Sequence, residues 1–114
     1  MLDPKRTNNK MKKWYTNVVC ADGFSMSVQA NDSAYCSPKA TNARIYTEVE
    51  VGFPSDHEEL LDEYLESPES TKHHQEQVFP YVPVQIVTNV IAKHGGMVDG
   101  EVPPGVAPLR ASNR

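Results

Sequence analysis

The sequence predicts a small α+β domain in which an antiparallel sheet of three or four strands is packed by two helices. Three local signals support this fold class. An Asp-Gly pair at residues 22–23 separates two alternating segments, as in a β-hairpin. Ser55 and Glu58 have the spacing of a helix capping box. A second helix is bounded by Pro83 and by the glycines at 95–96.

The hairpin is expected to pair residues 15–20 with residues 24–30 across a two-residue type I′ turn. In that register Val19 faces Met26, and one face of the hairpin is almost wholly apolar. That face comprises Tyr15, Val19, Ala21, Phe24, Met26, Val28 and Ala30. A third strand is expected at residues 45–51, because its apolar side chains alternate with Tyr46, Glu48 and Glu50.

The first helix is expected to run from the capping box to about Glu66, with Leu60, Leu61, Tyr64 and Leu65 as its apolar stripe. A short strand follows at residues 78–82, and Pro80 confines it to a sheet edge or a bulge. The second helix presents an apolar stripe made of Val84, Val87 and Ile91, with Ile86 and Val90 beside it. Met97-Val98 can add a strand, so the order is β-β-β-α-β-α-(β).

The 114 residues suit one domain at residues 14–98, between a disordered basic arm at 1–13 and a proline-rich flexible tail at 99–114. No run is long and apolar enough for a membrane span, and no signal peptide is recognisable. We therefore expect a cytoplasmic protein. Cys20 and Cys36 are expected to be free buried thiols, unless the fold brings them close enough for a disulfide.

The net charge of −4 conceals a segregation. Residues 1–14 carry five cations and one acid, which leaves the other 100 residues with a net charge of −8. Ten acids lie in residues 48–76, where Lys72 is the only cation. An anionic body repels phosphate, so direct binding to nucleic acid is not expected, whereas a basic protein surface is a suitable partner.

Seven of these acids are the candidate partner-binding residues: Glu48, Glu50, Glu58, Glu59, Asp62, Glu63 and Glu66. A solvated face that keeps the protein soluble explains the same pattern without any partner. The polar loop at residues 31–44 is a second candidate, because loops of this length often bind something. Tyr35, Lys39 and Arg44 would form its ligand site, and an anionic ligand would need both cations there.

No cofactor is indicated. The four histidines and two cysteines lack the spacing of a zinc site, and Cys36 has no histidine placed beside it by the sequence. The carboxylate pairs Glu48/Glu50 and Glu58/Asp62 lack the aromatic platform that a glycosidase uses. The glycines at 95–96 follow a helix, whereas a phosphate loop precedes one. An enzyme is therefore the least favoured class.

Five segments, CADGFSMSVQA, AYCSP, YTEVEVGFPS, YVPVQIV and KHGGMVDGE, together resemble a group of short, uncharacterised proteins encoded by tailed bacteriophages and prophages. The resemblance covers about residues 14–102. It implies a viral accessory or virion protein, and it transfers no catalytic or binding residue.

The leading hypothesis is a non-enzymatic phage accessory protein that binds a host protein through its acidic strand and helix, and whether binding inhibits the host protein is left open. Two alternatives stay open. One is a minor virion or assembly component. The other is an oligomer that binds a small ligand such as a nucleotide signal, and the sequence does not decide whether copies of the chain associate.

Overall fold

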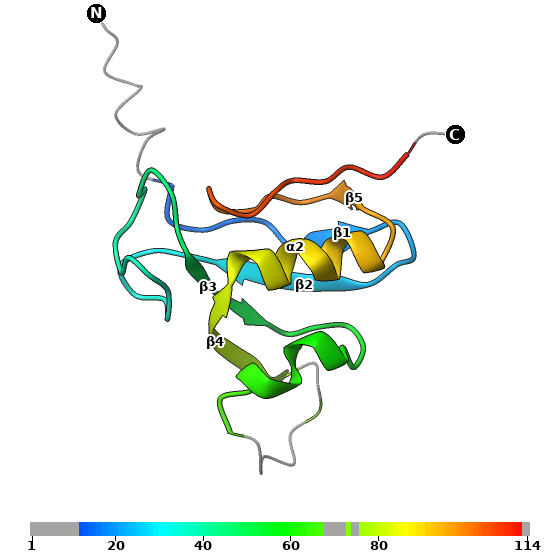
Figure 1. The fold of residues 1–114 in the computed structure, drawn as a ribbon, viewed down its shortest axis with the longest axis horizontal. Coiled ribbons are helices and arrows are strands. Elements are labelled where there is room, and N and C mark those ends of the chain that lie inside the picture. The colour runs from blue at the N-terminus through cyan, green and yellow to red at the C-terminus, as the bar shows by residue number, and fades with distance from the viewer. Residues whose placement is uncertain (1–11, 68–72, 74–75, 113–114) are drawn as a thin grey trace, which may run out of the picture.

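The computed structural model describes residues 12–67, 73 and 76–112, and it has the predicted α+β architecture (Figure 1). Its strands form one antiparallel sheet in the order β4-β3-β2-β1-β5. This is five strands rather than three or four. The elements, in chain order, are β1 (Val18–Cys20), β2 (Ser25–Gln29), β3 (Glu48–Gly52), the 3-10 helix η1 (Glu59–Tyr64), β4 (Val78–Pro83), α2 (Val84–Lys93) and β5 (Met97–Asp99).

The core lies between the sheet and the two helices. Helix α2 crosses one face of the sheet over β1 and β2, and η1 packs beside β4 and α2 (Figure 1). Burying each large aliphatic side chain there contributes roughly 1.5–3 kcal/mol. The side chains with no exposed surface include Val18, Met26, Val28, Val49, Val51, Leu61, Val82, Val87, Val90 and Ile91.

The hairpin forms, but its predicted register is wrong by one residue on β1. Val18, rather than Val19, pairs with Met26. The Cys20 N–H donates to the Phe24 carbonyl at 2.8 Å, which closes a three-residue loop. The glycine in that loop has a φ of 95°, the left-handed conformation that such a loop requires at its last position. The extra loop residue turns Val18 and Cys20 toward the core in place of Val19 and Ala21.

Strand β3 begins at Glu48, three residues later than predicted. Val49 and Val51 point to the core as expected, but Ile45 is 62% exposed and Tyr46 is buried. The Tyr46 N–H donates to the carbonyl of Pro104 at 2.9 Å, so this part of the chain pairs with the C-terminal segment instead of with β4. A partner 58 positions away in the sequence overrides the local alternation.

The predicted capping box does not form. The Ser55 hydroxyl accepts the N–H of Ser25 at 2.9 Å. Glu58 is itself the N-cap, and its carboxylate accepts the N–H of Leu60. The helix that follows is a 3-10 helix that ends at Tyr64, before the predicted end at Glu66.

Helix α2 matches its prediction closely. It begins directly after Pro83, which is both the last residue of β4 and the N-cap. Val87, Val90 and Ile91 are fully buried, while Val84 and Ile86 are only partly so. The glycines at 95–96 have φ values of 93° and 91°, which the predicted cap requires.

Strand β4 is an edge strand, as Pro80 predicts. Phe79 and Val82 pair with the β3 residues on either side of Glu50, so Pro80 and Tyr81 together face Glu50. This bulge lets Phe79 and Val82 both point to the core and leaves Tyr81 43% exposed. Tyr81 has a φ of 54°, which an aromatic residue rarely adopts.

The prediction of an unpacked tail at 99–114 is wrong for its described part, residues 99–112. The Met97 N–H donates to the Leu109 carbonyl at 2.7 Å, and the Ala111 N–H donates to the Met97 carbonyl at 2.9 Å. The segment therefore runs along the outer edge of β5, as Figure 1 shows in red. Val106 is 4% exposed and joins the core. The predicted arm at 1–13 lies almost wholly outside the described residues.

A comparison of two glycines tests this arrangement of the C-terminal segment. Gly100 has a φ of 101°, and a Cβ there would clash with the Asn17 carbonyl. Gly23 has a φ of 95° with nothing within 4 Å of an added Cβ. We expect Gly23→Ala to lower the free energy of unfolding by about 1 kcal/mol and Gly100→Ala by at least about 3 kcal/mol. Equal losses in urea denaturation would contradict the close contact.

Candidate functional site

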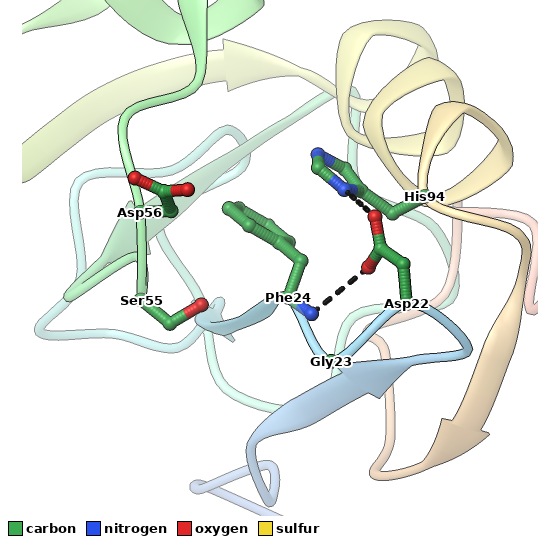
Figure 2. Close-up of a pocket in the computed structure, with 6 residues that line it drawn as sticks. All are labelled: Asp22, Gly23, Phe24, Ser55, Asp56 and His94. Atoms are coloured by element: carbon green, nitrogen blue, oxygen red, sulfur yellow. Dashed lines mark hydrogen bonds and ion pairs between the residues drawn. The ribbon is translucent and has the colours of Figure 1, made fainter.

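The site with the densest polar contacts begins at the tip of the β1–β2 hairpin. The Asp22 Oδ1 accepts the N–H of Phe24 at 2.9 Å, an interaction that fixes the carboxylate within the loop. The Asp22 Oδ2 then lies 2.6 Å from Nδ1 of His94, the residue that ends α2 (Figure 2). Residues 72 positions apart in the sequence are therefore joined.

The His94 ring is held on three sides. Its Nε2 lies 2.6 Å from Oε1 of Glu58, opposite the contact with Asp22. The ring also stacks on Phe24, with centroids 4.1 Å apart and planes inclined by 11°. Both partners are carboxyl groups, and with ionised carboxylates each ring nitrogen donates, as the charged imidazolium does.

Glu58 is the centre of this network. Its residue is 3% exposed, and its Oε2 accepts both the Lys93 ammonium at 2.8 Å and the Leu60 N–H at 2.9 Å. One buried carboxylate therefore receives bonds from His94, Lys93 and the first turn of η1. We call Asp22, Glu58, Lys93 and His94 the charge network.

The charge network shifts the pKa values of its members. Burial alone would lower the pKa of His94, but the hydrogen bonds to Asp22 and Glu58 outweigh it and raise the pKa above 6.5. Burial alone would raise the pKa of Glu58, but the bonds from Lys93, Leu60 and His94 outweigh it and lower the pKa below 4.5. The pKa of Asp22 is lowered by the Phe24 N–H and then by His94.

A pocket of about 380 Å³ opens beside the charge network. Figure 2 shows its lining, in which Phe24 stands between Asp56 and His94 and the Ser55 side chain lies on the same side as Asp56. A serine near a histidine and an aspartate resembles a catalytic triad, but here both nitrogens of His94 are bonded to carboxylates. His94 therefore has no lone pair with which to activate Ser55.

The cysteines and the metal-binding residue types add no further site within the described residues. Cys20 and Cys36 are free and buried, as predicted. Burial, followed by the charge of Asp22, raises the pKa of Cys20 to about 11, so its reactive thiolate is scarce at neutral pH. Within the described residues, no group of three or more His, Cys, Asp and Glu side chains could hold a metal ion.

The seven candidate partner-binding acids do not form one surface. Glu48 and Glu50 point away from α2, on the open face of the sheet, and accept bonds from the Ser37 hydroxyl and the Tyr35 N–H. Glu58 is buried, so its prediction as a surface residue is wrong. The other four are exposed on or just after η1, on the side of the sheet that carries α2: Glu59, Asp62, Glu63 and Glu66.

The three candidate ligand residues of the 31–44 loop do not line one cavity. Lys39 donates to the Ala34 carbonyl at 2.8 Å and lies over the Tyr35 ring, 5.2 Å from its centroid. Arg44 is exposed. A cleft of about 110 Å³ beside the loop contains neither Lys39 nor Arg44, so the two cations needed for an anionic ligand do not meet there.

Sequence reasoning missed both the charge network and the exposed aromatic side chains of Trp14 and Tyr81. Lys93 and His94 stand at the end of a helix, where the helix dipole alone favours basic residues, so their sequence positions do not call for a partner. A partner for them could have been suspected among the acids at the start of the first helix, of which Glu58 is the N-cap.

Neither a family model, nor a curated protein, nor a solved structure matches this chain. In the part of the chain that the structure describes, no helix is long and apolar enough to cross a membrane.

Removal of the central carboxylate tests the charge network. We expect Glu58→Ala to lower the free energy of unfolding by about 2–3 kcal/mol, because three donors lose their acceptor. The loss should stay below that of a fully buried pair because the Lys93 side chain, 43% exposed, can regain water. The adjacent and exposed Glu59→Ala is the matched control, with an expected change within about 0.5 kcal/mol. Similar effects of the two substitutions in urea denaturation would refute the role of Glu58.

The charge network also predicts how stability depends on pH. Because the pKa of His94 is raised above 6.5 on folding, its contribution is complete below that pH and is lost as pH rises through the folded pKa. Because the pKa of Glu58 is lowered below 4.5, its contribution is lost as pH falls through the folded pKa. The free energy of unfolding should therefore be greatest between about pH 4.5 and pH 6.5.

Two matched variants test the decline on the alkaline side of this profile. His94→Gln should flatten the decline above pH 6.5, whereas His57→Gln, which removes an exposed pair with Asp62, should leave it. Urea denaturation across the pH range measures both. A decline that His94→Gln does not change would contradict the assignment.

Proposed function

We propose that this protein is a non-enzymatic binding protein that docks on a basic protein surface through the exposed acids of η1. The acidic helix surface comprises Glu59, Asp62, Glu63 and Glu66, all of which are exposed. Four carboxylates within eight residues present a concentrated negative potential, which steers a basic partner and sets its orientation. This exposure is the observation that carries the proposal.

Local pairing leaves most of this charge available. His57 pairs with Asp62 at 2.9 Å, and Lys93 and His94 are both bonded to Glu58. Among the described residues, no cation lies within ion-pair distance of Glu59, Glu63 or Glu66. The nearest basic side chains are thus engaged in holding the fold together, and the outer acids face solvent.

Helix stability accounts for Glu59 and Asp62, which lie in the first turn, but not for Glu63 and Glu66. Acids are favourable at the start of a helix and unfavourable at its end, and η1 has no basic residue in its last turn. Glu63 and Glu66 are therefore placed where the backbone dipole opposes them. Solubility alone would be served equally well by acids dispersed over the surface.

The resemblance to short proteins of tailed bacteriophages and prophages suggests where such a partner would be found. In an infected bacterium the partner would be a host protein of the cytoplasm, and a nucleic-acid-binding groove is one kind of strongly basic surface. Carboxylates docked there would stand where phosphates normally stand, and the host protein would be inhibited.

Charge reversal on the acidic helix surface tests the proposal. Proteins captured from bacterial lysate by the immobilised full chain would be quantified by mass spectrometry for the wild type and for the double variant Glu59→Lys/Glu63→Lys. We expect the amount of a captured basic protein to fall about tenfold or more in the variant, because close charge pairs at an interface are each worth 1.4 kcal/mol or more.

The control reverses the same number of charges elsewhere. Asp32 and Glu76 are exposed and lie outside the acidic helix surface, so Asp32→Lys/Glu76→Lys should retain capture. Circular dichroism would verify that both double variants fold. If the helix variant captures the same proteins in the same amounts as the wild type, or if the wild type captures nothing basic, the proposal is wrong.

A further inference from the structure

A second surface of different chemistry lies on the face of the sheet that α2 leaves open. Three aromatic side chains are exposed there: Trp14 at 65%, Tyr35 at 43% and Tyr81 at 43%. They share one face because Trp14 lines the same cleft as Glu50, the Tyr35 N–H donates to Glu50, and the rings of Tyr35 and Tyr81 are 5.9 Å apart. We call Trp14, Tyr35, Tyr81 and Glu50 the aromatic face.

The backbone places Tyr81 on this face at a cost. In a regular strand Tyr81 would point to the same side as Phe79, into the core, and the bulge opposite Glu50 turns it outward. Its φ of 54° lies in the left-handed region, which disfavours a residue with a Cβ. An exposed ring gains little burial in return. Strain of this kind is found at functional sites, although Phe53 has the same φ outside this face.

The charge of the aromatic face is negative where the cleft lies. Glu50 is the only charged residue among those lining the cleft, and its Oε2 has no hydrogen bond in the described part of the chain. The cations nearby are engaged: Lys12 pairs with Glu101, Lys13 pairs with Asp32, and Lys39 is bonded to the Ala34 carbonyl.

The two amide side chains of the cleft are engaged as well. Gln29 bonds the backbone N–H and carbonyl of Tyr15 at 2.8 and 2.6 Å, and Asn31 donates to the Lys13 carbonyl at 2.8 Å. They fix the chain on either side of Trp14 against the sheet. Because Lys39 already lies over the Tyr35 ring, the free recognition groups are the rings of Trp14 and Tyr81 and one carboxylate oxygen of Glu50.

We propose that the aromatic face binds a basic segment of a partner protein, with one Arg or Lys side chain held by Glu50 and by the rings of Trp14 and Tyr81. A cation is attracted both by the carboxylate and by the negative faces of Trp and Tyr rings. The cleft of about 110 Å³ is smaller than the roughly 300–1,000 Å³ of small-molecule sites, so it suits the end of one side chain.

This inference goes beyond the acidic helix surface and does not depend on it. Glu48 and Glu50 lie on the face of the sheet opposite to α2, whereas η1 packs on the α2 side. A partner that contacts one surface need not contact the other. Substitutions in the acidic helix surface leave the residues of the aromatic face in place, and the reverse also holds.

The single tryptophan of the chain provides a direct readout, since Trp14 belongs to the aromatic face. The full chain would be titrated with a flexible peptide of four Gly-Arg repeats and, separately, with the same peptide carrying neutral citrulline in place of arginine. We expect the arginine peptide to change Trp14 fluorescence saturably and the citrulline peptide not to do so.

Three variants locate the binding. Glu50→Gln and Tyr81→Gly should each raise the Kd for the arginine peptide at least about fivefold. Phe53→Gly is the matched control, because Phe53 is also an exposed aromatic with a φ of 54° but lies outside the aromatic face. It should leave the Kd within about twofold. Circular dichroism would verify that each variant folds.

The variant Glu59→Lys/Glu63→Lys distinguishes this inference from the proposed function. If the arginine peptide still changes Trp14 fluorescence saturably in that variant, the result supports binding at the aromatic face, whatever the lysate capture shows. The inference is overturned if that variant loses the titration, if Glu50→Gln and Tyr81→Gly bind as the wild type does, or if arginine and citrulline peptides act alike.

Discussion

The buried carboxylate of Glu58 is the interaction on which the arrangement of the three parts of this domain depends. It receives hydrogen bonds from His94 and Lys93 at the end of α2 and from Leu60 at the start of η1, and His94 carries the connection on to Asp22 at the hairpin tip. An unpaired carboxylate at that depth would be strongly unfavourable. The two cations of the helix end are thereby committed to the fold, and no other acid in the described part of the chain is buried.

Much of the fold could be predicted because its turns and caps are local. The glycines at 95–96 and Pro83 mark the ends of α2, and Pro80 marks β4 as an edge strand, through backbone restrictions that hold in any context. Registers and packing partners are not local. The loop at Asp22 holds three residues where two were expected, and the C-terminal segment packs through partners that its proline-rich composition does not reveal.

The functional surfaces were harder to predict from the sequence for the same reason. The acidic run reads as one band, yet β-strand alternation and the position of η1 divide it between opposite sides of the sheet, and one of its members, Glu58, is buried. The aromatic face joins Trp14, Tyr35 and Tyr81, which come from three separate parts of the chain and meet only because a bulge in β4 turns Tyr81 outward. No spacing in the sequence encodes that meeting.

The central claim is that His94 is a doubly hydrogen-bonded imidazolium held between two carboxylates. Nitrogen-15 NMR of the histidine ring over a pH titration, assigned by comparison with His94→Gln, tests it most directly. The account predicts that both ring nitrogens of His94 keep their protons to a higher pH than those of a free histidine, because the hydrogen bonds to Asp22 and Glu58 raise the pKa above 6.5 against the opposing effect of burial. A ring that loses one of these protons at or below pH 6.5 would contradict it, and would return His94 to the set of groups able to act as a base.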